Sequence, residues 1–248
     1  MASSRVALVC LLGLLVAASP ASIAADKIFY QIAFMWPGAY CAQTKSGCCM
    51  PKTDVVPAGD FYVAGFTVYD AATNYAETGC NDIPFNINQL GDTTKLMQYW
   101  NNIKCPSTTG QKSWKNAWET SGVCSNLTES VYFETALALR DKINPLSRLP
   151  DFGLYSVEKI KKTIQKGTGT TPLIQCSKGP FNKFQLYQIF VCVAEDTKTF
   201  IECPPPKKPY TCSDEILFHP FKKWMLNTTT KSYAAKAIDQ FIEMTLEI

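Results

Sequence analysis

Cysteine is the residue type that most constrains how this chain can fold. The 248 residues include eleven cysteines, of which Cys10 lies in an apolar run near the N-terminus. That run, residues 6–16, follows Arg5 and leads into small residues up to Ala25, which is the pattern of a cleaved secretion signal. We therefore expect residues 1–25 to be removed, which leaves ten cysteines in a chain that has passed through an oxidising compartment. An even number of cysteines there predicts five disulfides with no thiol left over.

Zinc ligation is the rival use of many cysteines. Structural zinc sites usually contain C-x-x-C pairs, and this sequence has none, because Cys48 and Cys49 are adjacent and the other gaps are long. We expect no metal site and no cofactor. After residue 25, no stretch approaches the roughly 20 apolar residues of a membrane-spanning helix, so we expect no membrane partner. The net charge of +3 comes from interspersed residues of both signs, which does not indicate a nucleic-acid binder.

The pattern of apolar residues predicts one mixed domain. Residues 27–34, 60–68 and 184–193 have the composition of β-strands. Residues 128–140 and 156–165 have the spacing of helices, with Pro145 and Gly167 beyond their ends as stop signals. Helices in the middle of the chain with strands on either side favour an α+β fold. Because no linker divides the chain, we assign one domain to residues 26–226 and a C-terminal extension to residues 227–248.

Residues 29–41, followed by Cys48, Cys49 and Pro51, resemble the opening of plant T2-type ribonucleases, in which a strand leads into Trp-Pro and a close group of cysteines. The similarity continues through residues 114–118, 122–124, 132–133, 136–137, 172–176, 185–189, 203–204 and 218–220. The resemblance implies a single disulfide-rich domain with a central antiparallel β-sheet and several flanking helices. It also implies the disulfide pairs Cys41–Cys48, Cys49–Cys105, Cys80–Cys124, Cys176–Cys212 and Cys192–Cys203.

Members of that family cleave RNA by attack of the ribose 2′-hydroxyl on the adjacent phosphorus, and two motifs carry the chemistry. The first, Phe-Thr-Ile-His-Gly-Leu-Trp-Pro, resembles residues 66–73, where Tyr69 stands in place of the histidine. The second, His-Glu-Trp-x-Lys-His-Gly-x-Cys, resembles residues 116–124. There Asn116 and Ser121 replace the two histidines, Ala117 replaces the glutamate and Thr120 replaces the lysine.

These substitutions remove the groups that transfer protons in the family. The reaction needs a base for the hydroxyl, an acid for the leaving 5′-oxygen and groups that stabilise charge on the phosphoryl oxygens. Tyrosine ordinarily titrates near pH ~10, and serine and threonine do not titrate in a useful range. We therefore predict a catalytically inactive chain that is not an enzyme. The single histidine, His219, is interpreted as a structural or surface residue, and its action with a carboxylate such as Glu119 or Asp70 stays open as the alternative.

The resemblance implies a function that needs no chemistry, because some plants accumulate ribonuclease-like proteins as vegetative storage proteins. We predict such a role in the storage of nitrogen and amino acids, without an obligatory partner, in the vacuole or outside the cell. The alternative is a defence protein, or a module that binds RNA, a nucleotide or a glycan weakly, with Trp36, Tyr69, Tyr75, Trp114 and Trp118 as stacking surfaces. Packing of these rings in the core is the favoured interpretation.

Two glycosylation sequences and the C-terminal extension complete the prediction. Asn126 and Asn227 each begin an Asn-x-Thr sequence, which predicts a glycan on a secreted chain, although Asn126 can instead serve only as a turn residue before a helix. The extension carries apolar residues at helical spacing. It is interpreted either as a terminal helix that packs on the domain or as a removable vacuolar sorting peptide, and both interpretations stay open.

Overall fold

A mixed β-sheet lies at the centre of the computed structural model, which describes residues 27–43, 47–53, 55–149, 151–179 and 182–228. The seven strands run in the order β3-β1-β6-β8-β4, and β5 and β7 also pair with β6. They are β1 (Ile28–Met35), β3 (Tyr62–Asp70), β4 (Gly153–Ser156), β5 (Leu173–Lys178), β6 (Phe184–Ala194), β7 (Phe200–Ile201) and β8 (Glu215–Phe218). The pairs are antiparallel except β6 with β8. The predicted α+β fold with a central, mainly antiparallel sheet is confirmed.

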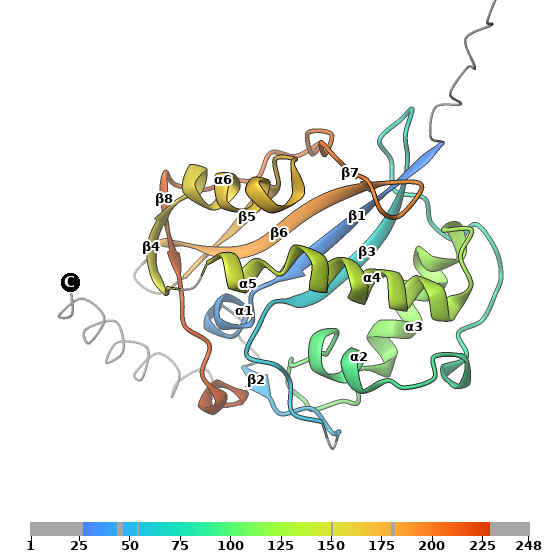
Figure 1. Ribbon diagram of the computed structural model, residues 1–248. Coiled ribbons are helices and arrows are strands. Elements are labelled where there is room, and N and C mark those ends of the chain that lie inside the picture. Colours follow the sequence, from blue (N-terminus) through green and yellow to red (C-terminus); the bar gives the residue numbers. More distant parts are fainter. Residues whose placement is uncertain (1–26, 44–46, 54, 150, 180–181, 229–248) are drawn as a thin grey trace, which may run out of the picture.

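Helices pack on the sheet and beyond its β3 edge (Figure 1). They are α1 (Pro37–Gln43), α2 (Thr94–Tyr99), α3 (Gln111–Thr120), α4 (Glu129–Ile143), α5 (Pro145–Arg148) and α6 (Val157–Thr168), with short 3₁₀ turns η1 (Ile87–Gln89), η2 (Gly122–Cys124) and η4 (Lys223–Leu226). Figure 1 shows α4 running across the sheet, with α2 and α3 beside β3. This arrangement places α3 and the turn after it next to the middle of β3.

The core forms between the sheet and α4. In β1, alternate residues Tyr30, Ile32 and Phe34 are buried on one face, as the period of two in a strand requires. The Phe66 ring of β3 stacks on Tyr30, and its centroid lies 5.3 Å from that of Tyr132 in α4. Burial of such aromatic rings is a major source of stability in a core. The strand and the helix are therefore held together by aromatic packing.

The two predicted helices are present, but they run further than their stop signals suggest. Helix α4 continues past residue 140 to Ile143, where Asn144 caps it in the left-handed conformation and Pro145 begins α5. Helix α6 passes through Gly167 and ends before Gly169, whose φ of 78° favours glycine. A β-carbon on Gly167 would lie 2.0 Å from the guanidinium carbon of Arg148, so this glycine admits the α5 side chain rather than stopping the helix. The predicted stop at Gly167 is therefore wrong.

Five disulfides cross-link the described residues, in the same pairs that the resemblance implied. They are Cys41–Cys48, Cys49–Cys105, Cys80–Cys124, Cys176–Cys212 and Cys192–Cys203. The last two bind both ends of the segment 203–212 to the neighbouring strands β5 and β6. This segment is therefore held against the sheet even though it contains no helix or strand.

A second, two-stranded sheet pairs β2 (Cys48–Cys49) with β9 (Asn227–Thr228). The predicted domain boundary after residue 226 falls immediately before β9, whose backbone pairs with β2, and the division of the chain at this point stays a prediction. The predicted signal, residues 1–25, lies outside the described residues, as does the part of the C-terminal extension from residue 229 onward.

Arg140 of α4 forms a buried ion pair with Asp60, which precedes β3. The arginine side chain is 6% exposed and that of Asp60 is 19% exposed. The guanidinium also lies 3.8 Å from the centre of the Tyr99 ring and 2.8 Å from a carboxylate oxygen of Asp141. These contacts join α4, α2 and the start of β3, three parts of the chain that are far apart in sequence.

Glu129, the first residue of α4, is buried with 3% exposure and accepts a hydrogen bond from the Asn86 amide at 3.1 Å. Burial raises the pKa of this carboxyl, and the nearby Glu119 carboxylate raises it further, although the Asn86 amide opposes them. The folded state therefore holds the proton more tightly than the unfolded state. The stability that this group contributes is present below its unfolded pKa, near ~4.3, and is lost as the pH rises through the higher folded pKa.

We expect the Glu129→Gln variant to lack this contribution, because an amide keeps the acceptor oxygen but does not ionise. Its free energy of unfolding, relative to that of the unchanged chain, should increase as the pH rises from 4 to neutral. Urea denaturation at several pH values measures the difference. The exposed substitution Glu134→Gln, also in α4, is the matched control. A difference that stays constant with pH would contradict the prediction.

Candidate functional site

A groove of about 600 Å³ lies between β3 and α3. Thr67 of β3 forms part of one wall, and the residues at the second-motif positions form the other, because Asn116, Ala117, Thr120 and Ser121 all line the groove. Asn116 and Thr120 are four residues apart on one helix, so they lie on the same face. The structure therefore brings together every substituted position of the second motif.

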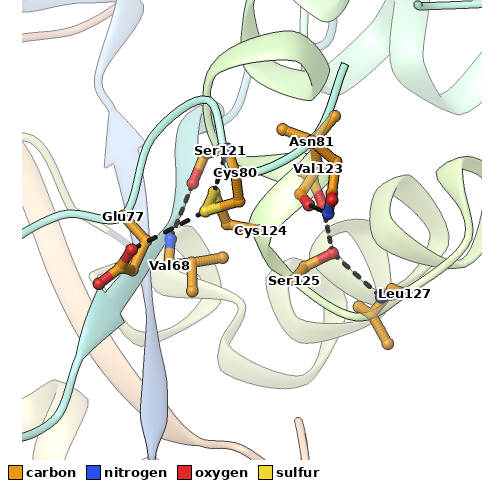
Figure 2. Close-up of a disulfide and its surroundings, with 10 residues drawn as sticks. Val68, Glu77, Cys80, Asn81, Ser121, Val123, Cys124, Ser125 and Leu127 are labelled. Atoms are coloured by element: carbon orange, nitrogen blue, oxygen red, sulfur yellow. Dashed lines mark hydrogen bonds between the residues drawn. A yellow bond between two sulfur atoms is a disulfide. The ribbon is translucent and has the colours of Figure 1, made fainter. Parts of the chain in front are cut away.

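Ser121 is the most deeply placed of these residues, with 5% exposure. Its hydroxyl oxygen accepts a hydrogen bond from the Val68 amide of β3 at 2.8 Å (Figure 2). Val68 lies between Thr67 and Tyr69 in the sequence of β3. This hydrogen bond therefore attaches the end of α3 to β3. Ser121, which stands at the second histidine position of the motif, therefore connects α3 to β3.

The turn after Ser121 is fixed by close packing and by a disulfide. Gly122 packs directly on Trp118, since a β-carbon there would lie 2.3 Å from the indole ring. Cys124 is bonded to Cys80, and the Asn81 side chain donates to the Val123 carbonyl at 2.8 Å (Figure 2). These contacts hold the groove wall in place. In this chain the glycine and the cysteine of the second motif thus fix the turn after α3.

Tyr69, at the histidine position of the first motif, lines a different cavity from the other motif positions. Its ring stacks on Phe29, its partner in the β1–β3 register, with centroids 5.1 Å apart. Its hydroxyl donates to the Gln31 side-chain oxygen at 3.4 Å. Burial raises the pKa of this phenol, which keeps it protonated at neutral pH. Tyr69 therefore does not share the groove with the second-motif positions, although Phe66 and Thr67 of the first motif line it.

Lys112 is the only residue with a charged side chain among the described residues that line the groove. It lies four residues before Asn116, so helical spacing would have indicated that it shares the groove face. Asn102 also lines the groove, and the sequence offered no signal for it because it follows a separate helix, α2. The groove thus presents one ammonium group with amides and hydroxyls. This set suits the binding of a phosphate and a base, whereas proton transfer would depend on groups that do not titrate near neutral pH.

His219 lies just after β8, is 5% exposed and does not line the groove. Its Nδ1 atom donates to the Pro220 carbonyl at 2.7 Å, and its own carbonyl accepts from the Trp36 indole at 2.5 Å. Burial lowers the pKa of the imidazole. The histidine is therefore a buried residue that helps hold the indole of Trp36 in the core.

The two carboxylates considered as partners for this histidine are engaged elsewhere. Glu119 lies 3.8 Å from the Lys115 ammonium and accepts from the Phe85 amide at 3.3 Å. Asp70 accepts from both the amide and the hydroxyl of Thr73, each at 2.6 Å. Neither contact joins these carboxylates to the buried imidazole.

Three of the five residues considered as stacking surfaces are core residues. Trp36 and Trp114 have no exposed surface, and Trp118 is 2% exposed. Each indole N–H donates to a backbone carbonyl, those of His219, Trp100 and Ile83 respectively. A ring that is covered on both faces cannot stack on a ligand, so the alternative of stacking is wrong for these three tryptophans, which pack in the core as the favoured interpretation had it. Tyr69 is partly exposed, Tyr75 is exposed, and both line a cavity.

Asn126 is exposed and has a φ of 57°, in the tight turn before α4. The backbone of Asn227 pairs with β2. Glycosylation at both positions stays a prediction. Among the residues that the structure describes, no group of three or more acidic, histidine or cysteine side chains is arranged to hold a metal ion. In that same part of the chain, no helix has the length and apolar character needed to cross a bilayer.

Comparison with known families assigns this fold. The model of the Ribonuclease T2 family matches residues 27–203, which is more than half of the chain. The chain belongs to the Ribonuclease T2 family. Ribonuclease 1 of Arabidopsis thaliana is 34% identical over 227 residues, which cover 86% of this chain and 96% of the relative. The structure of RNase NT in complex with 5′-AMP superposes with a TM-score of 0.72 at 30% identity, and the match covers 79% of this chain and all of that one.

A second kind of relative is also present in the family. The ribonuclease-like storage protein of Panax ginseng is 27% identical over 184 residues, which cover 71% of this chain and 74% of the relative. This T2 family chain is therefore similar both to proteins that are named as ribonucleases and to one that is named as a storage protein.

The prediction that this chain is not an enzyme is contradicted by the comparison. Its relative at 34% identity is named as a ribonuclease, and the similar solved structure is a ribonuclease with a bound nucleotide. The chain belongs to a family of ribonucleases, and the substituted motif positions do not remove it from that family.

Proposed function

We propose that this member of the T2 ribonuclease family is a storage protein that follows the secretory route to the vacuole or to the outside of the cell. The observation that carries the proposal is a contrast within the molecule. All five disulfides are in place, whereas the motif positions in the groove hold Asn116, Ala117, Thr120 and Ser121. A storage role depends on the first feature and makes no demand on the second.

Durability is the physical property that storage requires. A native disulfide in a secreted domain typically contributes about 2–5 kcal/mol of stability, and five of them restrict local opening that proteases exploit. The similarity to the storage protein of Panax ginseng supports the proposal further.

Quantitative mass spectrometry of the tissues that make the protein tests the storage role. We expect the chain to be a major soluble protein of a resting organ and to decline during regrowth. Another T2 family member in the same extracts, with histidines at both motifs, is the internal control. A trace level that stays constant through regrowth would contradict storage.

Nucleotide binding in the groove is a second candidate, and we propose it because the groove combines one ammonium group with amides that can recognise a base. The similarity to a ribonuclease solved with 5′-AMP supports this candidate. We propose that Lys112 contacts the phosphate and that Asn102 and Asn116 face the sugar or base. With a single exposed cation, binding would be weak, because an exposed ion pair contributes only about 0–1 kcal/mol.

We expect 5′-AMP to bind saturably and the Lys112→Gln variant to bind it about twofold to fivefold more weakly, since a loss of up to about 1 kcal/mol corresponds to at most about fivefold in affinity. Chemical-shift titration by NMR measures both dissociation constants. Lys166→Gln, an exposed substitution on α6 that does not line the groove, is the matched control. Absence of saturable shifts at millimolar 5′-AMP would retire this candidate.

A further inference from the structure

A second cavity, of about 300 Å³, lies where the segment 203–212 faces Tyr69 of β3. Tyr69, Tyr75 and Tyr210 contribute three phenol rings to it, and Lys207 and Lys208 contribute two ammonium groups. These residues come from β3, from the loop that follows it and from the segment between β7 and β8. No carboxylate is among the described residues that line the cavity. It is therefore an aromatic cavity with a positive rim.

The wall formed by the segment 203–212 is held in place before any ligand arrives. Disulfides bind its two ends to β6 and β5. Four prolines, Pro204, Pro205, Pro206 and Pro209, restrict its backbone. The Asn74 side chain donates to the carbonyl of Pro205 at 3.4 Å, which connects this wall to the opposite loop. A wall fixed in this way loses little entropy on binding, which favours affinity.

Two of the phenol rings that line the cavity have one face covered by another aromatic ring of the protein. Tyr69 stacks on Phe29, and Tyr210 stacks on Phe190 with centroids 5.2 Å apart. At the rim, Tyr75 is 64% exposed and the Lys207 ammonium lies over its ring. Aromatic faces stack on planar rings, and the ammonium groups beside them can pair with a carboxylate on the same ligand.

We propose that this cavity binds a small planar aromatic carboxylate of the benzoate or cinnamate class. The ring of the ligand lies among the tyrosine and proline rings, and its carboxylate pairs with the ammonium groups of Lys207 and Lys208. The volume is at the lower limit of ordinary ligand cavities, which suits one ring and a short acid chain. The proposal goes beyond the storage role and uses none of the groove residues.

Isothermal titration of the full mature chain with trans-cinnamate tests the proposal. We expect saturable binding in the micromolar to millimolar range that the uncharged cinnamyl alcohol does not reproduce. Lys207→Gln should weaken the binding of cinnamate about twofold to fivefold, because it removes one charge from the rim. Lys166→Gln makes the same change of charge outside the cavity and should leave binding unchanged.

A second variant tests the cavity itself rather than its charge. Ala76 is exposed and lines the cavity, so Ala76→Phe fills the space and should abolish binding while the thermal transition stays in place. The proposal is overturned if cinnamate shows no saturable binding. It is equally overturned if Lys112→Gln, in the groove, weakens cinnamate while Lys207→Gln does not. Binding of 5′-AMP that depends on Lys112 but does not displace cinnamate would keep the two sites distinct.

Discussion

Replacement of Arg140 by methionine is expected to lower the free energy of unfolding by about 3–5 kcal/mol, because it leaves a largely buried carboxylate without its partner. The Asp60 side chain is only 19% exposed, so water cannot fully replace the guanidinium. Methionine keeps much of the volume that packs against Tyr99, which confines the effect to the charge. Urea denaturation with the disulfides intact, followed by tryptophan fluorescence, measures the loss.

The other partner of this arginine supplies the matched control. Asp141 is 42% exposed, and Asp141→Asn should cost only about 0–1 kcal/mol, as surface ion pairs usually do. The double variant Arg140→Met, Asp60→Asn should be more stable than Arg140→Met alone, because it no longer buries an unpaired charge. Equal losses in the free energy of unfolding for Arg140→Met and Asp141→Asn would show that the buried ion pair contributes no more stability than the exposed one.

The strands and the approximate helices of this fold could be predicted because their signals are local. Alternation of apolar residues places Tyr30, Ile32 and Phe34 on one face of β1, and the same alternation operates in β3. The end of α6 could not be predicted, because the role of Gly167 depends on Arg148, a side chain from another helix. The pairing of Arg140 with Asp60 also lay beyond the sequence, since 80 positions separate the two residues.

Some features of the candidate site could likewise be predicted from the sequence, and others could not. The grouping of Asn116, Thr120 and Ser121 follows from the pitch of one helix and the turn after it, and Lys112 could have been added on the same basis. The orientation of Tyr69 could not be predicted, because it depends on the register that places Phe29 opposite it. Whether an aromatic ring is covered also depends on the whole fold, and this is why the tryptophans could be assigned to the core only as the favoured alternative.

The triple variant Tyr69→His, Asn116→His, Ser121→His is expected to cleave RNA at least about 100-fold faster than the unchanged chain, since a positioned general acid or base contributes ~10²–10⁴-fold. Asn116 is exposed, so its replacement costs little packing. Ser121→His removes the acceptor for the Val68 amide, and a buried amide left without an acceptor costs about 1–3 kcal/mol. Cleavage of a fluorogenic RNA from pH 4 to 8 measures the gain, which should peak where one imidazole is protonated and another is not.

The gain depends on whether an imidazole at position 69 can reach the groove. Tyr69 lies two residues after Thr67 on the same face of β3, about 7 Å along the strand, and Thr67 lines the groove. The prediction requires the imidazole, which is smaller than the phenol that stacks on Phe29, to turn toward the groove. Glutamines at the same three positions are the matched control, because they offer hydrogen bonds without transferring protons. Equal rates for the histidine variant, the glutamine variant and the unchanged chain would show that geometry, rather than the missing imidazoles, limits the reaction.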